Sequence, residues 1–350
     1  MKIAVLSTTS WRTPPHDYGP SESFTSSIAE GLHKRGVDVT LFATKDSLTA
    51  AKLEAIAPIG SEEDFFHGKG EIHKDARYWE YLHIANCFDR AGEFDLIHNN
   101  INFPPFSITP HIKTPVVTTV HSGRTEFDVN PLTLTIYKKY NKYNHYVAIS
   151  NSARHPEISY DATIYHGINP ANYTFHPKKG SYLLLFGRID QDKGAAEAIS
   201  IAKQFGMKLV LAGIAPNQRY FKEQIAPHID GTQVEFIGAV GGEKKSKILG
   251  EAYALLHLIN FAEPFGYSVI EALATGTPVV ALNKGAMREI IDSGKTGFVV
   301  NSQAEVLEKL DSISNINRVH CRESIIDRFT EERMVDNYVT LFEQILSRKG

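Results

Sequence analysis

Cysteine is nearly absent from this sequence, because its 350 residues contain only Cys87 and Cys321. Two distant cysteines exclude a disulfide framework, so a reducing, cytoplasmic environment is expected. Long apolar runs are absent as well, since none approaches the roughly 18 residues of a membrane-spanning helix. The opening MKIAVLS is too short for a signal peptide and is typical of a first β-strand.

An excess of positive charge is also missing. The first 175 residues contain 16 Lys and Arg against 19 Asp and Glu, the remainder contains 21 against 21, and the net charge is −3. Neither half is basic, so nucleic acid is not an expected partner. The 15 histidines show no metal-binding spacing such as H-E-x-x-H, and no metal site is expected.

Short apolar runs alternate with amphipathic stretches in two successive series, a pattern typical of doubly wound parallel sheets. In the first series we expect strands at 3–6, 37–42, 96–98, 116–120 and 146–149, and helices at 23–34, 78–91 and 132–141. In the second series we expect strands at 182–186, 208–212, 234–237, 254–258, 279–282 and 298–300, and helices at 195–204, 220–225, 244–249, 269–274 and 287–291.

The chain is about twice the length of a usual domain. We therefore predict an α/β protein with two Rossmann-like doubly wound domains. The first comprises residues 1–172 with a C-terminal helix at 331–350, and the second comprises residues 178–330. A Pro-, Gly- and Lys-rich link lies near 170–180. Ligands bind at the carboxyl ends of such strands, so the expected site is a cleft between the domains.

Two carboxylates seven residues apart, Glu263 and Glu271, stand out in EPFGYSVIEALATGTPVV. Pro264 excludes a helix interior, so Glu263 belongs to a loop. A helix is expected from about Ser268 to Gly276, with Glu271 in its first turn. The amide groups at its start form a phosphate site flanked by two acceptors for sugar hydroxyls. In the alternative interpretation, Ser268 and Glu271 form a capping box and Glu271 is only structural.

The predicted second domain opens with LLLFGRIDQDKG, in which Arg188 and Lys193 flank the turn after a strand. Two cations at that position can bind a diphosphate. The alternative for either residue alone is a solvated basic turn. Asp190-Gln191-Asp192 matches the D-x-D pattern of metal-dependent sugar transferases, but the neighbouring cations compete with a divalent ion, so we interpret the match as coincidence.

Two features of the first half are weaker signals. His121 follows the strand predicted at 116–120, where an imidazole can donate to a substrate hydroxyl or assist proton transfer. A single histidine is more often a packed or exposed residue. The loop after the first strand ends in Gly19-Pro20-Ser21, which can approach an anion or a hydroxyl closely before a helix begins. Most Gly-Pro pairs are simply turns.

Taken in order, VVTTVHSG, LLLFGRIDQDKG, FIGAV and EPFGYSVIEALATGTPVVALNKGAMREII resemble the retaining glycosyltransferases of family 4. The resemblance covers nearly the whole chain and implies the GT-B fold, with a C-terminal helix that crosses back to the N-terminal domain. It implies catalytic roles for His121, Arg188, Lys193 and Glu263. It also implies donor or nucleotide binding by Gly19, Gly187, Arg188, Lys193, Val240, Gly266, Tyr267, Ser268 and Glu271.

The resemblance further implies transfer of a hexose, with retention, from a nucleoside diphosphate sugar to a hydroxyl acceptor. A UDP-sugar is favoured as the co-substrate, and neither a cofactor nor a metal ion is expected. The acceptor is a carbohydrate, another small molecule or a lipid. The alternative is a nucleotide-sugar-binding protein of this fold without turnover. Peripheral membrane contact through 137–143 is less favoured, since three lysines are few for that purpose.

Two departures from the family pattern concern the expected site. The N-terminal loop reads Gly19-Pro20 where Gly-Gly is common, so one backbone donor is lost. The segment before Glu289 reads Lys284-Gly285-Ala286-Met287 in place of a double glycine. We expect these differences to bear on the acceptor and on the donor sugar, respectively.

Overall fold

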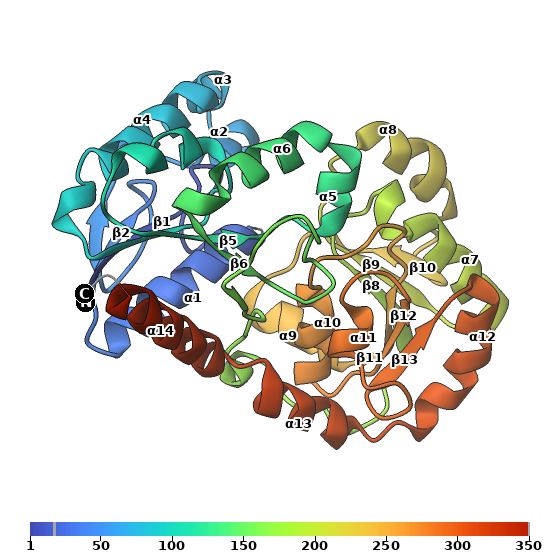
Figure 1. The fold of residues 1–350 in the computed structure, drawn as a ribbon. Coiled ribbons are helices and arrows are strands. Elements are labelled where there is room, and N and C mark those ends of the chain that lie inside the picture. The colour runs from blue at the N-terminus through green and yellow to red at the C-terminus, as the bar shows by residue number, and fades with distance from the viewer. Residues whose placement is uncertain (17–18, 349–350) are drawn as a thin grey trace. The chain divides into compact units, whose positions relative to one another are not determined.

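The computed structural model describes residues 1–16 and 19–348. It contains two compact units, of which unit 1 comprises Met1–His166 with Glu331–Gly350 and unit 2 comprises Gly167–Thr330. The division at residue 166 precedes the link predicted near 170–180 by a few residues. The prediction that the C-terminal helix returns to the N-terminal unit is confirmed (Figure 1).

Unit 1 is built on a seven-stranded parallel sheet with the order β3-β2-β1-β4-β5-β6-β7. Its strands are β1 (Lys2–Leu6), β2 (Asp38–Phe42), β3 (Lys52–Glu54), β4 (Leu96–Asn99), β5 (Val116–Val120), β6 (His145–Ala148) and β7 (Ala162–Thr163). Its helices are α1 (Pro20–Lys34), α2 (Ser61–His67), α3 (Glu71–Lys74), α4 (Ala76–Phe88), α5 (Arg124–Val129), α6 (Pro131–Tyr140) and α14 (Glu331–Ser347).

Apolar side chains cover both faces of this sheet. On one face, α1 and α14 lie side by side and bury Phe24, Leu32, Tyr338 and Phe342 against the strands (Figure 1). On the other face, α4 contributes a separate core cluster that includes Cys87. Burial on both faces explains why the strands are nearly continuous apolar runs, as parallel sheets require.

Unit 2 is built on a six-stranded parallel sheet with the order β10-β9-β8-β11-β12-β13. Its strands are β8 (Tyr182–Phe186), β9 (Leu209–Ala212), β10 (Val234–Phe236), β11 (Ala252–His257), β12 (Val279–Leu282) and β13 (Gly297–Val300). Its helices are α7 (Ala195–Phe205), α8 (Gln218–Tyr220), the π-helix η7 (Phe221–Ile225), α9 (Gly242–Gly250), α10 (Tyr267–Ala274), α11 (Met287–Ile290), α12 (Gln303–Ser312) and α13 (Arg318–Arg328).

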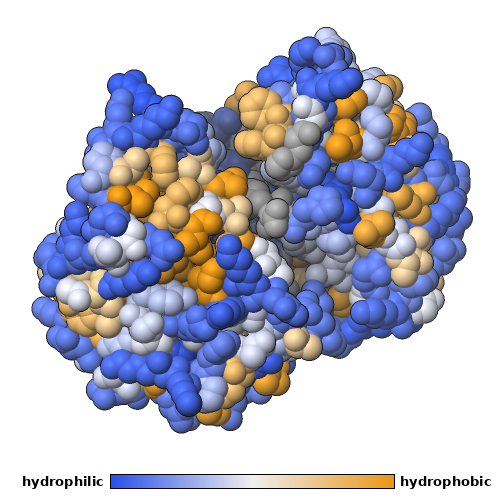
Figure 2. All heavy atoms as spheres, turned by 180° about the vertical axis from the view of Figure 1, so that it is seen from behind, coloured by the Kyte–Doolittle hydropathy of each residue, from blue (hydrophilic) through white to orange (hydrophobic). Residues whose placement is uncertain are grey.

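Every predicted strand and helix is present, and the α/β class with two parallel sheets is confirmed. The edge strands β3 and β7 and the helices α2, α3, α5, α12 and α13 were not predicted from the sequence. Among the described residues no helix is long and apolar enough to span a bilayer. The face drawn in Figure 2 is mainly hydrophilic, with separate hydrophobic areas on it.

Candidate functional site

In unit 2 the chain order reverses between the two central strands, β8 and β11. The connections after these strands leave the sheet in opposite directions, which opens a crevice at their carboxyl ends where ligands bind in sheets of this kind. Arg188 and Lys193 follow β8, and Glu263 follows β11. The three residues therefore reach one edge of one sheet, although up to 75 positions separate them in sequence.

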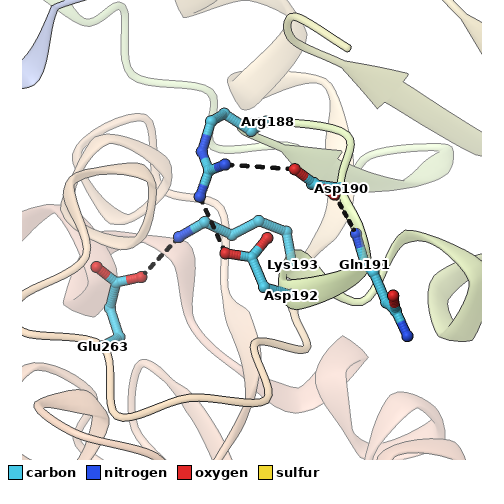
Figure 3. A network of polar contacts seen from close by, with 6 residues as sticks. All are labelled: Arg188, Asp190, Gln191, Asp192, Lys193 and Glu263. Carbon is cyan, nitrogen blue, oxygen red and sulfur yellow. Dashed lines mark hydrogen bonds and ion pairs between the residues drawn. The ribbon is translucent and has the colours of Figure 1, made fainter. Parts of the chain in front are cut away.

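Lys193 and Glu263 form an ion pair at this edge (Figure 3). The Lys193 ammonium donates to Glu263 Oε2 at 2.9 Å, and the two side chains are 20% and 15% exposed. The same ammonium lies 4.6 Å from the centre of the Phe261 ring. A lysine has three N–H donors, so this pairing leaves donor capacity for a further anion.

Arg188 lies beside this pair and contacts two acids of its own turn (Figure 3). Its guanidinium donates to Asp192 Oδ2 at 2.9 Å and, more weakly, to Asp190 Oδ2 at 3.4 Å. Asp190 also accepts from the Gln191 amide and thereby begins the short 3-10 turn at Gln191–Lys193. The acids of the D-x-D sequence thus balance the charge of Arg188, which agrees with interpreting that match as coincidence.

Gly285 fixes the position of the Glu263 loop. A Cβ atom at residue 285 would lie 2.0 Å from the carbonyl oxygen of Glu263, and the residue has a φ of +57°. The next amide, that of Ala286, donates to the same carbonyl at 2.9 Å. Only glycine permits this close backbone approach, so the departure noted at 284–287 still provides the one glycine that the loop requires.

Helix α10 begins one residue earlier than predicted, at Tyr267, with Gly266 as its N-cap in a left-handed conformation. The first amide to bond within the helix is that of Val269, which donates to Gly266 O at 3.1 Å. The capping-box alternative is wrong, because within the described chain no side chain caps this helix. The placement of Glu271 in the first turn is also wrong, because the earlier start makes it the fifth helical residue.

The side chain of Glu271 is nonetheless held by hydrogen bonds. It is 8% exposed, and its Oε1 accepts from both Tyr173 Oη and Lys245 Nζ at 2.7 Å. Tyr173 precedes β8, and Lys245 lies on α9. The sequence motifs do not indicate either residue, because none links them to a glutamate on another helix.

Two further predicted residues lie at the same edge of the sheet. Gly187 continues β8, since its amide donates to Ala212 O at 2.9 Å, and its φ is +146°. Val240 is buried four residues beyond the end of β10. Both positions agree with the expectation that ligand-binding residues follow the strands.

His257, the last residue of β11, was missed. It is 6% exposed, its Nδ1 lies 3.5 Å from Ser268 Oγ, and its Nε2 is buried with no hydrogen-bond partner in the described part of the chain. Burial lowers its pKa to about 4, while the nearby Glu263 carboxylate acts in the opposite direction. The position of His257 at the end of a strand is the signal from which it could have been predicted as a site residue.

The predicted residue His121 lies in unit 1, directly after β5, among other rings. Its imidazole packs against Phe24 at 4.9 Å and stacks on His166 at 5.5 Å between ring centres. Burial lowers the pKa of His121 to about 4, so the ring is neutral at pH 7. Its Nε2 has no hydrogen-bond partner among the described residues.

The Phe24 ring also contacts His98 and Tyr338, which belong to a buried chain of hydrogen bonds. Thr119 Oγ1 is 2.8 Å from His98 Nε2 and 2.8 Å from Tyr338 Oη, so one hydroxyl joins β4, β5 and α14. Burial lowers the pKa of His98 to about 3. This arrangement ties the C-terminal helix to β5, the strand that His121 follows.

Gly19, the remaining predicted residue, is the N-cap of α1. A Cβ atom there would lie 2.8 Å from Glu22 Oε2 and 2.9 Å from Pro15 Cβ. Glu22, which sequence analysis missed, is 2% exposed and accepts from Thr8 Oγ1. Burial raises the pKa of this carboxyl. The tight turn at Gly19 therefore packs against the buried carboxyl group of Glu22.

No group of three or more His, Cys, Asp or Glu side chains is placed to hold a metal ion in residues 1–16 and 19–348. The metal prediction is not tested by this observation. The cations named above belong to unit 2, whereas Gly19 and His121 belong to unit 1.

Two family models match the chain, one for each half. Residues 21–172 match the model described as Glycosyltransferase Family 4, and residues 172–328 match Glycosyl transferases group 1. The chain belongs to the family 4 type of glycosyltransferases. The family resemblance inferred from sequence motifs is thereby confirmed.

Individual relatives agree with this assignment. A 2-deoxystreptamine N-acetyl-D-glucosaminyltransferase of Niallia circulans is 28% identical over 173 residues, which are 46% of this chain and 44% of the relative. The chain spans less than half the length of the first curated relatives it matches. An uncharacterized glycosyltransferase of Methanocaldococcus jannaschii is 23% identical over 86% of this chain and 85% of its own.

A solved structure of Anabaena HepE in complex with UDP and glucose has the same fold. The TM-score is 0.75 at 20% identity, over 98% of this chain and 99% of HepE. This likeness, with the two parallel sheets, confirms the predicted GT-B fold.

Proposed function

We propose that this protein transfers a sugar from a nucleoside diphosphate sugar to an acceptor hydroxyl, with retention of the anomeric configuration. The observation that carries the proposal is that Arg188 and the Lys193–Glu263 ion pair both follow the strands at the reversal of unit 2. Two cations and an acid held together at this edge fit a ligand with both a diphosphate and sugar hydroxyls.

The diphosphate binds to Arg188 and Lys193, next to the amide groups at the start of α10. Each charge-assisted hydrogen bond of this kind contributes roughly 1.5–3 kcal/mol. The contacts described for Arg188 use two of the five N–H donors of its guanidinium, and Lys193 uses one of three. Gly266, Tyr267 and Ser268 add the positive end of the helix dipole.

The acids and the neighbouring loops bind the uncharged parts of the donor. Glu263 pairs with Lys193 through Oε2 and accepts from a donor-sugar hydroxyl with its other oxygen. Glu271 accepts from the ribose. Gly187 lets the backbone approach the phosphates, and the segment ending at Val240 meets the base. A uridine nucleotide is favoured, with support from the UDP complex of a protein of the same fold.

In the reaction, the bond between the anomeric carbon and the diphosphate oxygen breaks, and its electron pair stays on that oxygen. The acceptor oxygen bonds to the same face of the sugar and passes its proton to the departing phosphate. Arg188 and Lys193 stabilise the leaving charge, as oxyanion donors do in general. The neutral His121 and the turn at Gly19 serve the donor sugar and the acceptor from unit 1.

Because arginine, lysine and the helix dipole supply positive charge, we further propose that the reaction needs no metal ion. The acceptor is a hydroxyl of a carbohydrate, another small molecule or a lipid. We also propose that the protein acts in the cytoplasm, in line with its two unpaired, buried cysteines.

Calorimetric titration in excess EDTA tests the donor site. UDP, GDP and ADP are titrated into the wild-type protein and into Glu271→Ala, followed by the glucose, galactose, mannose and N-acetylglucosamine forms of the nucleotide that binds. We expect micromolar binding of one nucleotide and its loss in Glu271→Ala. If the wild-type protein binds none of the three, the proposed function is overturned.

A further inference from the structure

The two carboxylate oxygens of Glu271 differ in their hydrogen-bond partners. Oε1 accepts from Tyr173 Oη and from Lys245 Nζ, both at 2.7 Å. Oε2 has no donor among the residues that the structure describes. A carboxylate oxygen has two lone pairs in its plane, so these two donors fill Oε1. New donors from a ligand must therefore address Oε2.

The donors approach Glu271 from two elements outside its own helix. Lys245 lies on α9, whose N-terminus follows the segment that ends at Val240. Its ammonium also lies 5.6 Å from the centre of the Tyr173 ring, so the three side chains form one cluster. Lys245 is 26% exposed and Glu271 is 11% exposed at their side chains, so solvent only partly screens the ion pair.

Hydrogen bonds from neighbouring helices hold the backbone around Tyr173. Arg322 of α13 donates to Tyr173 O at 2.8 Å and to Pro170 O at 2.7 Å, and it also contacts the carbonyl of Ala274 at the end of α10. The amide of Thr174 donates to Ser246 Oγ on α9 at 2.8 Å. The backbone around the tyrosine is thus tied to α13 and α9, while its hydroxyl donates to Glu271 of α10.

We infer that Tyr173 and Lys245 are positioning residues that hold Glu271 by Oε1 and present Oε2 to the ribose hydroxyls of the nucleotide. The inference rests on the proposed function, which places the ribose at Glu271. An anchored carboxylate loses less conformational freedom when the ribose binds, so it discriminates between nucleotides with and without a hydroxyl better than a mobile one does.

The ratio of two dissociation constants tests this inference. For whichever of UDP, GDP or ADP binds, calorimetry compares the ribonucleotide with its 2′-deoxy form. We expect the wild-type protein to bind the ribonucleotide about tenfold or more tightly, as for a hydrogen bond to a charged group. In Tyr173→Phe and in Lys245→Met the ratio should fall to about threefold or less.

Two matched controls show whether a merely structural change could produce this result. Tyr182→Phe also removes a tyrosine hydroxyl that bonds to α9, at Ile248 O, and Lys247→Met removes a lysine of the same helix that pairs with Glu251. Both controls should keep the wild-type ratio. Lys245→Gln replaces Lys245→Met if the latter does not fold.

The outcomes separate the inference from the function on which it rests. If Tyr173→Phe and the Lys245 variant fold and keep the wild-type ratio, the inference is overturned while the donor site stands. The same holds if the wild-type protein binds both nucleotides equally. If the wild-type protein binds no nucleotide, the proposed function and the inference are both overturned.

Discussion

The two units use the same sheet architecture and differ in what they place at its carboxyl edge. In unit 2, the strands that flank the reversal are followed by paired charges, namely Lys193 with Glu263 and Arg188 with Asp192. In unit 1, the corresponding edge has His121 and His98 among aromatic rings, and burial holds the pKa of each well below its usual range.

This difference indicates what each unit can bind. A highly charged ligand needs charged partners that stay hydrated or paired when it is absent, as those in unit 2 do. Neutral imidazoles in a ring cluster suit uncharged hydroxyl groups instead, since each offers one donor and one acceptor. Under the proposed function, this difference assigns the nucleotide to unit 2 and sugar hydroxyls to unit 1.

The largest effect that would sharpen this comparison is expected at Lys193. Lys193→Ala should lower kcat by ~10²–10³, as loss of an oxyanion donor does, and should change the donor dissociation constant much less. Steady-state rates of nucleotide release and calorimetry of the same samples give the two values. Lys203→Ala, on the following helix α7, is the control. An unchanged kcat in Lys193→Ala would remove this lysine from the mechanism.

The next effect is the loss of folding stability at acidic pH, to which we expect unit 1 to contribute most. Burial lowers the pKa of His83 to about 4, and it also lowers the pKa of His98, His121 and His166. The folded-state pKa is depressed, so this stability is present above about pH 6.5 and is lost as the pH falls towards 4. For His83, a folded-state pKa of about 4 against an unfolded-state pKa of about 6.5 should cost about 2 kcal/mol of unfolding free energy between pH 7 and pH 5.

Urea unfolding at pH 7 and pH 5 measures this loss. Trp11 and Trp79, the two tryptophans of the sequence, both belong to unit 1, so their fluorescence reports that unit alone. In His83→Gln the difference between the two pH values should shrink by about 2 kcal/mol, whereas exposed His111→Gln should keep it. An equal difference in all three proteins would contradict the burial argument.

A smaller effect is expected at the backbone support of Glu263. Gly285→Ala should displace the Glu263 carbonyl and weaken binding of a nucleotide sugar about tenfold, because overpacking of this kind costs ~1–3 kcal/mol. Binding of the bare nucleotide should change less, since Glu263 is assigned to the sugar. Calorimetry with both ligands measures the two effects.

Gly294→Ala provides a matched control for this substitution. Gly294 also has a positive φ, +86°, but a Cβ atom there would meet nothing within 4 Å. It therefore carries the backbone strain without the close approach. Similar losses of sugar binding in both variants would attribute the effect to strain in unit 2 rather than to Glu263.

The sequence predicted the strands well because burial on both faces makes them apolar runs. It missed α13 because that helix uses buried polar side chains. Arg318 is 6% exposed and donates to the carbonyls of His176, Ala252 and Gly250. Hydrophobic periodicity does not reveal a helix that packs through guanidinium groups, and the short edge strands β3 and β7 have too few residues to show a pattern.

Within the candidate site, motif spacing located the residues at strand ends but not their partners. Arg188, Lys193 and Glu263 were selected from two motifs, and the fold brings them together. Tyr173 and Lys245 lie 98 and 26 positions from Glu271, and both contacts depend on how helices pack. His257 and Glu22 were missed because single residues at strand or helix ends have no distinctive spacing.

Hydrogen–deuterium exchange of the full chain with and without its nucleotide tests the central claim most directly, since it reports each unit separately. The account predicts slower exchange at 187–194, 237–245 and 263–272 when nucleoside diphosphate is bound, with little change in α1 and α14. Protection concentrated in unit 1, around 98–121, or no protection in those three segments would contradict the assignment of the nucleotide site to unit 2.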